Sequence, residues 1–246
     1  MDKIWLKSYP EGMPAEIDAD QFRSIPDLLD KLFSKFADKP AYHNLGRTIS
    51  YAELEALSRA FAAYLQGLPG MARGERVAIM APNLLQYPVV LFGILRAGMV
   101  VVNVNPLYTP RELEHQLQDS GARAIVIVEN FASTLQQVLG KTRVKHVITT
   151  QVGDLLPIPK RWLVNFVIKY VRKMVPAWQI DGATTLDAAL ERGSALPLGP
   201  VDIHAEDLAF LQYTGGTTGV AKGAMLTHRN ILANLEQTGI WISVSF

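Results

Sequence analysis

A run of glycines and threonines closed by a lysine carries the strongest chemical signal in this sequence. Glycines let successive backbone N–H groups converge on an anion, because no Cβ atom blocks the conformations with φ > 0. The threonine hydroxyls add hydrogen-bond donors, and the lysine adds a positive charge. The pattern therefore predicts a phosphate-binding loop, whose candidate residues are Tyr213, Thr214, Gly215, Gly216, Thr217, Thr218, Gly219, Lys222 and Gly223.

The order of its residues separates this loop from two other phosphate-binding motifs. The P-loop of nucleoside triphosphatases needs Gly-Lys followed by Ser or Thr, whereas here Lys222 precedes Gly223 and Ala224 follows. The G-x-G-x-x-G fingerprint of dinucleotide-binding folds does not occur in the loop either. The alternative interpretation is an ordinary turn rich in glycine and threonine.

The sequence offers few other groups that suit catalysis. It contains no cysteine, which excludes disulfides and thiolate catalysis. Its histidines are scattered without the spacing of metal ligands, so we expect no protein-built metal site and assign no catalytic residue. His228 follows the loop closely, which makes it a candidate auxiliary group at the phosphate site.

Short apolar runs alternate with segments of helical periodicity along the chain. Strands are expected at 76–80, 99–104, 124–128 and 144–149, with helices between them. Capping boxes at Ser50 and Thr109 mark the starts of two of these helices. Such alternation predicts right-handed βαβ units, and therefore an α/β fold with a mostly parallel sheet and helices on both faces.

The phosphate loop has a predictable place in such a fold. It follows the apolar run 208–213, so it should lie at the carboxyl end of a strand, where ligands of these sheets bind. A helix is expected from about Thr227 or His228 through Glu236. If the N-terminus of that helix pointed at the loop, it would strengthen phosphate binding.

We expect three parts along the chain. Residues 1–40 form a lead-in that packs on the core, and residues 41–200 form an α/β subdomain with a basic amphipathic helix near 160–175. Residues 201–246 form the start of a second α/β subdomain, which carries the phosphate loop.

The loop resembles the phosphate loop of the adenylate-forming enzymes, which comprise acyl-CoA synthetases, luciferases and peptide-synthetase adenylation domains. Their pattern reads Tyr/Phe-Thr-Ser-Gly-Ser/Thr-Thr-Gly-x-Pro-Lys-Gly, and residues 213–223 align with all of it. Gly215 stands in place of the usual Ser and removes a hydroxyl donor. Ala221 stands in place of the usual Pro and loosens the turn before Lys222.

Earlier blocks extend the resemblance over about residues 5–237. They lie at 49–54, 74–79, 93–98 and 103–113, in the order found in the family. The last block, together with the Tyr-Thr-Gly-Gly form of the loop, is most similar to bacterial long-chain fatty acid CoA ligases. The resemblance implies that the chain is part of the large N-terminal domain of an adenylate-forming enzyme.

The resemblance also implies a reaction. ATP would activate a long-chain fatty acid as its acyl-adenylate, and coenzyme A would then take the acyl group. Mg²⁺ would bridge phosphate oxygens, residues 214–219 would hold the β- and γ-phosphates, and Lys222 would add charge or order the closed loop. The family's later Gly-Tyr-Gly-x-Thr-Glu element has no counterpart before Phe246, so we expect a fragment that is inactive alone.

Two other functions stay open. One is a non-catalytic module that binds lipid, membrane or a partner protein. The other is a different nucleotide-dependent enzyme whose loop converged on this pattern. In addition, a truncated parallel sheet leaves strand edges or helix-facing surface unpaired, so a homo-oligomer is expected.

The segment 160–174 contains several basic residues and no acidic one. At the α-helical repeat its basic residues gather on one face, and its apolar residues fill most of the other. This pattern suits a bilayer interface rich in anionic lipid, with the candidates Lys160, Arg161, Trp162, Lys169, Arg172 and Lys173. The alternative is a surface helix that packs on the core by its apolar face.

Composition narrows the partners and the cellular location that we expect. A formal net charge of +1 gives no reason to expect a nucleic-acid partner. Residues 1–16 contain acidic residues and prolines where a signal peptide needs an apolar run, and no stretch is long and apolar enough to span a membrane. We therefore expect a cytoplasmic protein, with peripheral association with the inner membrane.

Overall fold

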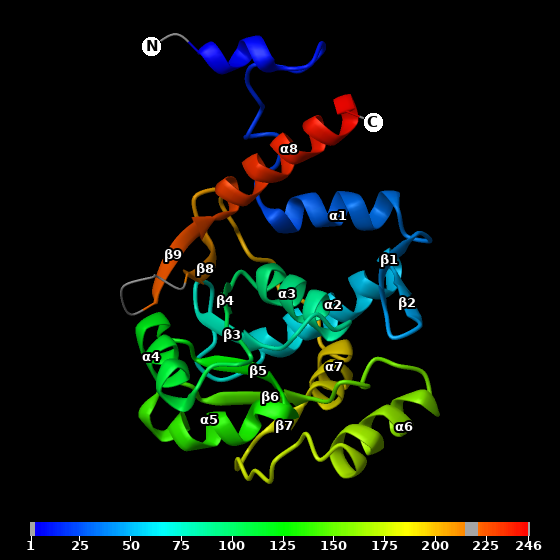
Figure 1. The fold of residues 1–246 in the computed structure, drawn as a ribbon, viewed down its shortest axis with the longest axis vertical. Coiled ribbons are helices and arrows are strands. Elements are labelled where there is room, and N and C mark those ends of the chain that lie inside the picture. Colours follow the sequence, from blue (N-terminus) through cyan, green and yellow to red (C-terminus); the bar gives the residue numbers. More distant parts are fainter. Residues whose placement is uncertain (1–2, 215–220, 246) are drawn as a thin grey trace.

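The computed structural model describes residues 3–214 and 221–245 (Figure 1). Its main sheet has seven strands among the described residues, in the order β7-β6-β5-β3-β4-β8-β9. Neighbouring strands are parallel except for β8 and β9. The bounds are β3 Arg76–Met80, β4 Val100–Asn103, β5 Ala124–Val128, β6 His146–Thr150, β7 Thr184–Thr185, β8 Leu208–Thr214 and β9 Lys222–Thr227.

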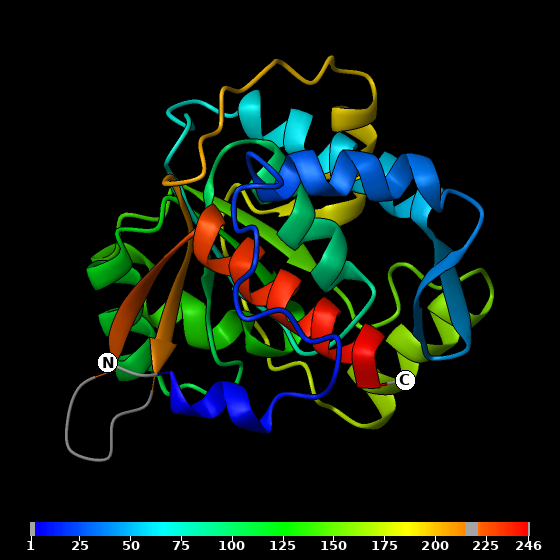
Figure 2. The same cartoon turned by 90° about the horizontal axis from the view of Figure 1, so that it is seen from above.

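Helices cover both faces of this sheet, which confirms the predicted fold class (Figures 1 and 2). One face carries α1 Ile25–Lys35, α2 Tyr51–Gln66, α3 Gln86–Arg96 and α7 Leu186–Ser194. The other carries α4 Pro110–Ser120 and α5 Ala132–Val138. The predicted capping boxes are present at Ser50 of α2 and Thr109 of α4.

The alternation of side chains along each strand divides the core into two apolar clusters. Val77 and Ile79 of β3 pack in the cluster beneath α2 and α3. Ala78 and Met80 point the opposite way, into the cluster beneath α4 and α5. Both faces of a parallel strand are therefore buried, which explains why these strands appear as continuous apolar runs in the sequence.

The N-terminal part joins the molecule through α1. Ile25, Leu29 and Phe33 of this helix are buried in the first cluster. The short helix η1, Ile4–Ser8, has no buried residue and lies at the top of Figure 1. Between α1 and α2 lies a small antiparallel hairpin of β1 Pro40–Asn44 and β2 Arg47–Ser50.

The last two strands, β8 and β9, belong to the main sheet. Strand β8 pairs with β4 in the same sheet, so the proposed boundary near residue 200 does not coincide with an edge of the sheet. Residues 222–227, for which no strand was predicted, form β9 antiparallel to β8. The helix predicted after them is present as α8, His228–Ser245, and extends past Glu236.

The basic amphipathic segment differs from its prediction in length and orientation. It forms α6, Lys160–Phe166, followed by one π-helical stretch, η4, Val167–Val171. It ends there rather than near residue 175, and Lys173 has a left-handed backbone with φ of 52°. Its polar side faces the protein, because acidic partners lie beneath it on other elements.

Further 3-10 turns, η2 Glu129–Phe131 and η3 Leu139–Lys141, flank α5. Among the described residues, no helix combines the length and the apolar character needed to cross a membrane.

Candidate phosphate-binding site

The β8–β9 hairpin frames the candidate phosphate loop. Thr214 at the end of β8 is the register partner of Lys222 at the start of β9, and both side chains are exposed. The pair stands at the carboxyl edge of the parallel strands, where ligands of such folds bind. Of the predicted site residues, Gly215, Gly216, Thr217, Thr218 and Gly219 lie outside the described part of the chain.

Tyr213 holds the base of this hairpin. Its hydroxyl donates to Asp119 Oδ2 of α4 at 2.5 Å. Burial raises the pKa of Tyr213, and the hydrogen bond to the Asp119 carboxylate raises it further, so the phenol is protonated at neutral pH. The hydroxyl is therefore committed to α4, and Tyr213 positions the loop rather than offering that proton to a phosphate.

Gly223 completes the anchor on the opposite strand. It is the register partner of Tyr213, and a Cβ atom at this position would lie 3.0 Å from the Tyr213 ring. Only glycine accepts so close an approach without displacing the ring. His115 of α4 adds a contact to the same end of the loop, because its Nε2 lies 3.3 Å from the Ala221 carbonyl oxygen.

A polar cluster that the sequence analysis missed lies beside the hairpin. Tyr87 donates to Asn103 Oδ1 at 2.9 Å, and Asn103 Nδ2 donates to Gln212 Oε1 at 3.1 Å. Together with Tyr108 and Tyr213, these side chains help to line a cavity of about 460 Å³. The cavity opens at the ends of β3, β4 and β8, beside Tyr213 at the base of the hairpin.

A signal for this cluster exists in the sequence. Asn103 and Gln212 are polar residues within two otherwise apolar runs that form strands. A polar residue within an otherwise apolar parallel strand is unusual unless it is hydrogen-bonded or borders a site. What the sequence does not show is that β4 and β8 are neighbours, which brings the two amides together.

The structure places His228, the candidate auxiliary group, away from Lys222. It begins α8, at the far end of the six-residue β9 from Lys222, so the two are separated by about 20 Å. Its side chain is buried, and Nδ1 accepts the backbone N–H of Ile25 at 3.2 Å. The N-terminus of α8 likewise lies at the far end of β9 from Lys222.

The environment of His228 explains its role. Burial lowers the pKa of His228 to about 4, although the negative charge of Asp207 opposes the shift. The ring is therefore neutral at physiological pH and can accept a hydrogen bond. It joins the start of α8 to the start of α1, which is a structural task.

The described residues can be compared as ligands for a metal ion and for a phosphate. They contain no group of three or more His, Cys, Asp or Glu side chains that could hold a metal ion. The donors expected at the loop are N–H, hydroxyl and ammonium groups, a set that suits phosphate oxygens.

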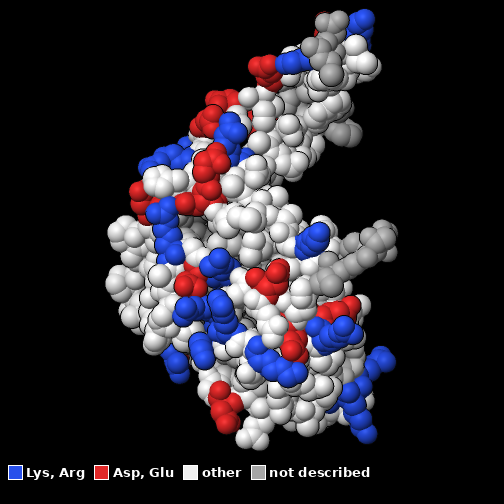
Figure 3. Space-filling view, turned by 90° about the vertical axis from the view of Figure 1, so that its left-hand side faces the viewer, with Lys and Arg blue, Asp and Glu red and all other residues white. Residues whose placement is uncertain are grey.

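On the face of the molecule in Figure 3, Lys and Arg side chains are intermingled with Asp and Glu.

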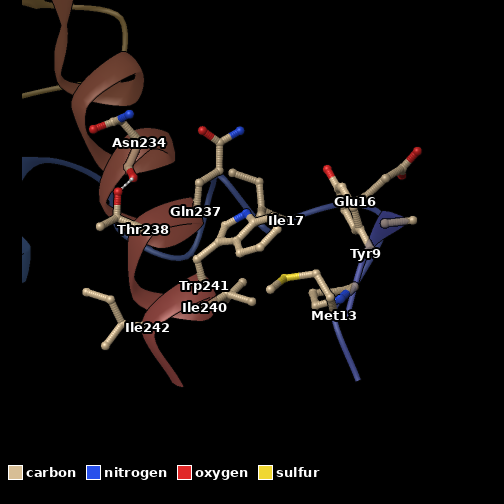
Figure 4. Close-up of a pocket in the computed structure, with 12 residues that line it drawn as sticks. Tyr9, Met13, Glu16, Ile17, Asn234, Gln237, Thr238, Ile240, Trp241 and Ile242 are labelled. Carbon is tan, nitrogen blue, oxygen red and sulfur yellow. Dashed lines mark hydrogen bonds between the residues drawn. The ribbon is translucent and has the colours of Figure 1, made fainter. Parts of the chain in front are cut away.

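A second cavity, of about 680 Å³, lies between the N-terminal segment and α8 (Figure 4). Trp241 points toward Tyr9 there, with the ring centroids 5.5 Å apart in an edge-to-face arrangement. Met13 and Ile17 also line it. None of the predicted phosphate-site residues borders this cavity.

The membrane-surface candidates fall into two groups. Arg161 and Lys169 turn toward the protein, where Arg161 pairs with Asp154 and Asp187, and Lys169 pairs with Glu129. Burial raises the pKa of Asp154, against the opposing hydrogen bonds and the charge of Arg161. The other candidates, Lys160, Trp162, Arg172 and Lys173, are exposed.

This mostly parallel sheet with helices on both faces matches the fold of solved CoA ligases. Residues 29–245 match the family described as AMP-binding enzyme, and the chain belongs to it. The long-chain-fatty-acid–CoA ligase of Salmonella typhimurium is 59% identical over 237 residues, which cover 96% of this chain and 42% of that protein. The ligase of the same name from Haemophilus influenzae is 57% identical over 246 residues, 100% of this chain and 44% of that protein.

Solved structures show the same fold. A long-chain-fatty-acid-CoA ligase from Archaeoglobus fulgidus aligns with a TM-score of 0.70 and 25% identity, over 96% of this chain and 42% of that chain. The anthranilate CoA ligase AuaEII, solved with anthranoyl-AMP, aligns with a TM-score of 0.69 and 20% identity, over 87% and 37%. This chain thus spans less than half the length of the curated relatives described above.

Proposed function

We propose that this chain is the phosphate-binding part of a ligase that activates a long-chain fatty acid with ATP and transfers the acyl group to coenzyme A. The observation that carries the proposal is the high identity to long-chain-fatty-acid–CoA ligases across nearly the whole chain. The family pattern in residues 213–223 supports it. The position of the β8–β9 hairpin at the carboxyl edge of the sheet supports it as well.

The proposed first step needs groups that attract a leaving pyrophosphate. A fatty-acid carboxylate oxygen attacks the α-phosphorus of ATP, and the bond from that phosphorus to the pyrophosphate oxygen breaks. Negative charge grows on the β- and γ-phosphates as the bond breaks. Fixed donors around those phosphates lower the barrier, because they need no reorganisation during the reaction.

The residues of the hairpin are suited to this task. The ammonium of Lys222 supplies positive charge, and the hydroxyl of Thr214 supplies a donor on the opposite strand. Tyr213 and Gly223 fix the distance between the two strands. Bound Mg²⁺ would neutralise phosphate charge alongside these groups.

A second candidate function is a non-catalytic module that binds lipid or membrane. One observation favours it, namely the row of exposed apolar side chains along α6 and η4. This function requires no nucleotide. Fatty-acid-dependent consumption of ATP therefore distinguishes the two candidates.

The test is an assay of acyl-CoA formation by the protein expressed from its complete gene. We expect activity that requires ATP, coenzyme A and a long-chain fatty acid. The Lys222→Ala variant should lower kcat/KM by about 100-fold, as loss of one transition-state donor does. A wild-type protein that folds but forms no acyl-CoA from any fatty acid would contradict the proposal.

A further inference from the structure

One surface of the molecule has an unusual concentration of exposed apolar side chains. Along α6, η4 and the turn after them, these side chains are between 56% and 65% exposed. We call this surface the docking face, and it consists of Trp162, Leu163, Phe166, Tyr170, Val171 and Met174. The Phe166 and Tyr170 rings contact each other, with their centroids 5.3 Å apart. Contiguous exposed apolar patches in monomeric proteins commonly mark interaction sites.

The docking face is held outward by the polar side of the same helix. Arg161 pairs with Asp154 at 3.1 Å and also with Asp187. Asn165 Oδ1 accepts the backbone N–H of Gly153 at 2.8 Å. Rolling the helix to bury its apolar side would break these contacts and leave the buried Asp154 carboxylate without its cation.

A second polar contact fixes the η4 end. Lys169 Nζ lies 3.6 Å from Glu129 Oε2, and the Glu129 side chain is only 12% exposed. The helix is thus anchored to the body through contacts along both α6 and η4. The exposure of the docking-face side chains is a consequence of this packing.

The charge around the docking face points to an anionic occupant. No acidic residue occurs between Asp154 and Asp181 in the sequence. Arg172 and Lys173 stand at its far end, and both are exposed. Lys160 at the near end is also exposed, although its Nζ donates to the Leu45 carbonyl oxygen. Aromatic side chains with a polar edge, such as those of Trp162 and Tyr170, favour the boundary between lipid headgroups and acyl chains.

The docking face is also free of the rest of the described chain. Figure 1 places α6 at the bottom of the molecule, whereas both ends of the chain lie at the top. Neither the N-terminal segment nor α8 covers it.

We propose that α6 and η4 dock this protein on the surface of a bilayer that contains anionic lipid. The helix lies in the plane of the interface, with the docking face among the headgroups and upper acyl chains and with the basic residues on lipid phosphates. Because the substrate proposed above is a lipid, such docking would place the protein where that substrate is. The inference itself depends only on the surface, and it holds or fails independently of ligase activity.

The test is flotation of the protein with vesicles made of equal parts phosphatidylcholine and phosphatidylglycerol. The variant Leu163→Glu/Phe166→Glu places two carboxylates on the docking face. Its matched control is Leu107→Glu/Leu196→Glu, which changes two apolar side chains that are 83% and 46% exposed elsewhere on the surface. Circular dichroism and thermal unfolding verify that both variants fold.

We expect wild type and control to float with the vesicles and the docking-face variant to lose about tenfold in bound fraction. A second variant, Arg172→Gln/Lys173→Gln, keeps the apolar side chains and should weaken binding to these vesicles but not to pure phosphatidylcholine. Wild-type protein that stays with the buffer, or a docking-face variant that floats like the control, overturns the proposal. Loss of self-association in the docking-face variant without any vesicle binding would instead assign the docking face to a second copy of the chain.

Discussion

The hydroxyl of Tyr213 donates to the carboxylate of Asp119 across 94 residues of sequence, with 2.5 Å between the oxygens. This bond joins the last turn of α4 to the strand that leads into the phosphate loop. The Tyr213 ring at the same time covers Gly223 on the returning strand. One side chain therefore holds both strands at the base of the loop, and α4 provides the fixed support.

Replacing Tyr213 by phenylalanine tests this anchor. The Tyr213→Phe variant should lower the free energy of unfolding by about 1 kcal/mol, since it removes one hydrogen bond to a charged acceptor that is itself exposed. Urea unfolding measures the change. The control is Tyr42→Phe, because the hydroxyl of Tyr42 makes no hydrogen bond to any described residue. Equal stability losses in the two variants would argue against the anchor.

Protonation of His228 should destabilise the fold in acid. Its pKa is about 4 in the folded protein and 6.5 in its ordinary state, so the unfolded chain binds the proton more tightly. The stabilisation due to neutral His228 is complete above pH 6.5 and is lost as the pH falls toward 4, in total by about 3 kcal/mol.

Denaturant unfolding between pH 4 and pH 7 tests this pH dependence. His228→Asn keeps an acceptor for the Ile25 N–H but cannot titrate, so its unfolding free energy should vary less over this range than that of wild type. The control is His43→Asn, at an exposed histidine. An unchanged pH profile in His228→Asn would show that other groups cause the acid sensitivity.

The Arg161 pairing should hold α6 to the body. Arg161→Met leaves the buried Asp154 carboxylate without its cation, which should cost about 3 kcal/mol. Hydrogen exchange at residues 160–171 should accelerate as the helix detaches. Arg172→Met is the matched control, since Arg172 is exposed on the same segment and should change stability by less than about 0.5 kcal/mol. Slow exchange retained in Arg161→Met would mean that other contacts suffice.

The crossing of α2 and α7 depends on a glycine. A Cβ atom on Gly193 would clash with the carbonyl oxygen of Ala60, which is backbone and cannot move aside easily. Gly193→Ala should therefore lower the unfolding free energy by about 3 kcal/mol. Gly140→Ala, where nothing lies within 4 Å of the added atom, is the control and should unfold like wild type.

The sheet could be predicted from sequence because its signals are local. The apolar runs of β3 and β5 and the capping boxes at Ser50 and Thr109 each depend on residues close together in the chain. Strand β9 was missed because its first two residues, Lys222 and Gly223, were assigned to the phosphate loop. The prediction therefore continued directly from the loop into a helix. That error also placed His228 too close to the loop.

The sequence also could not show which face of the helical segment 160–171 packs against the protein. The two faces of 160–171 are visible in the sequence, but which one meets the protein depends on Asp154, Asp187 and Glu129. Two of these partners lie more than twenty residues away on other elements. The polar cluster of Asn103 and Gln212 was missed for the same reason, because it exists only once β4 and β8 pair.

Titration calorimetry of this chain with Mg²⁺–ATP tests the central claim most directly. We expect binding by the wild-type chain that Lys222→Ala weakens at least about tenfold, because a charge-assisted contact to phosphate is lost. The control, Lys145→Ala, removes an exposed lysine that precedes β6 and should bind like wild type. A folded wild-type chain without measurable binding, or equal affinities in wild type and Lys222→Ala, would contradict the assignment of this loop to ATP phosphates.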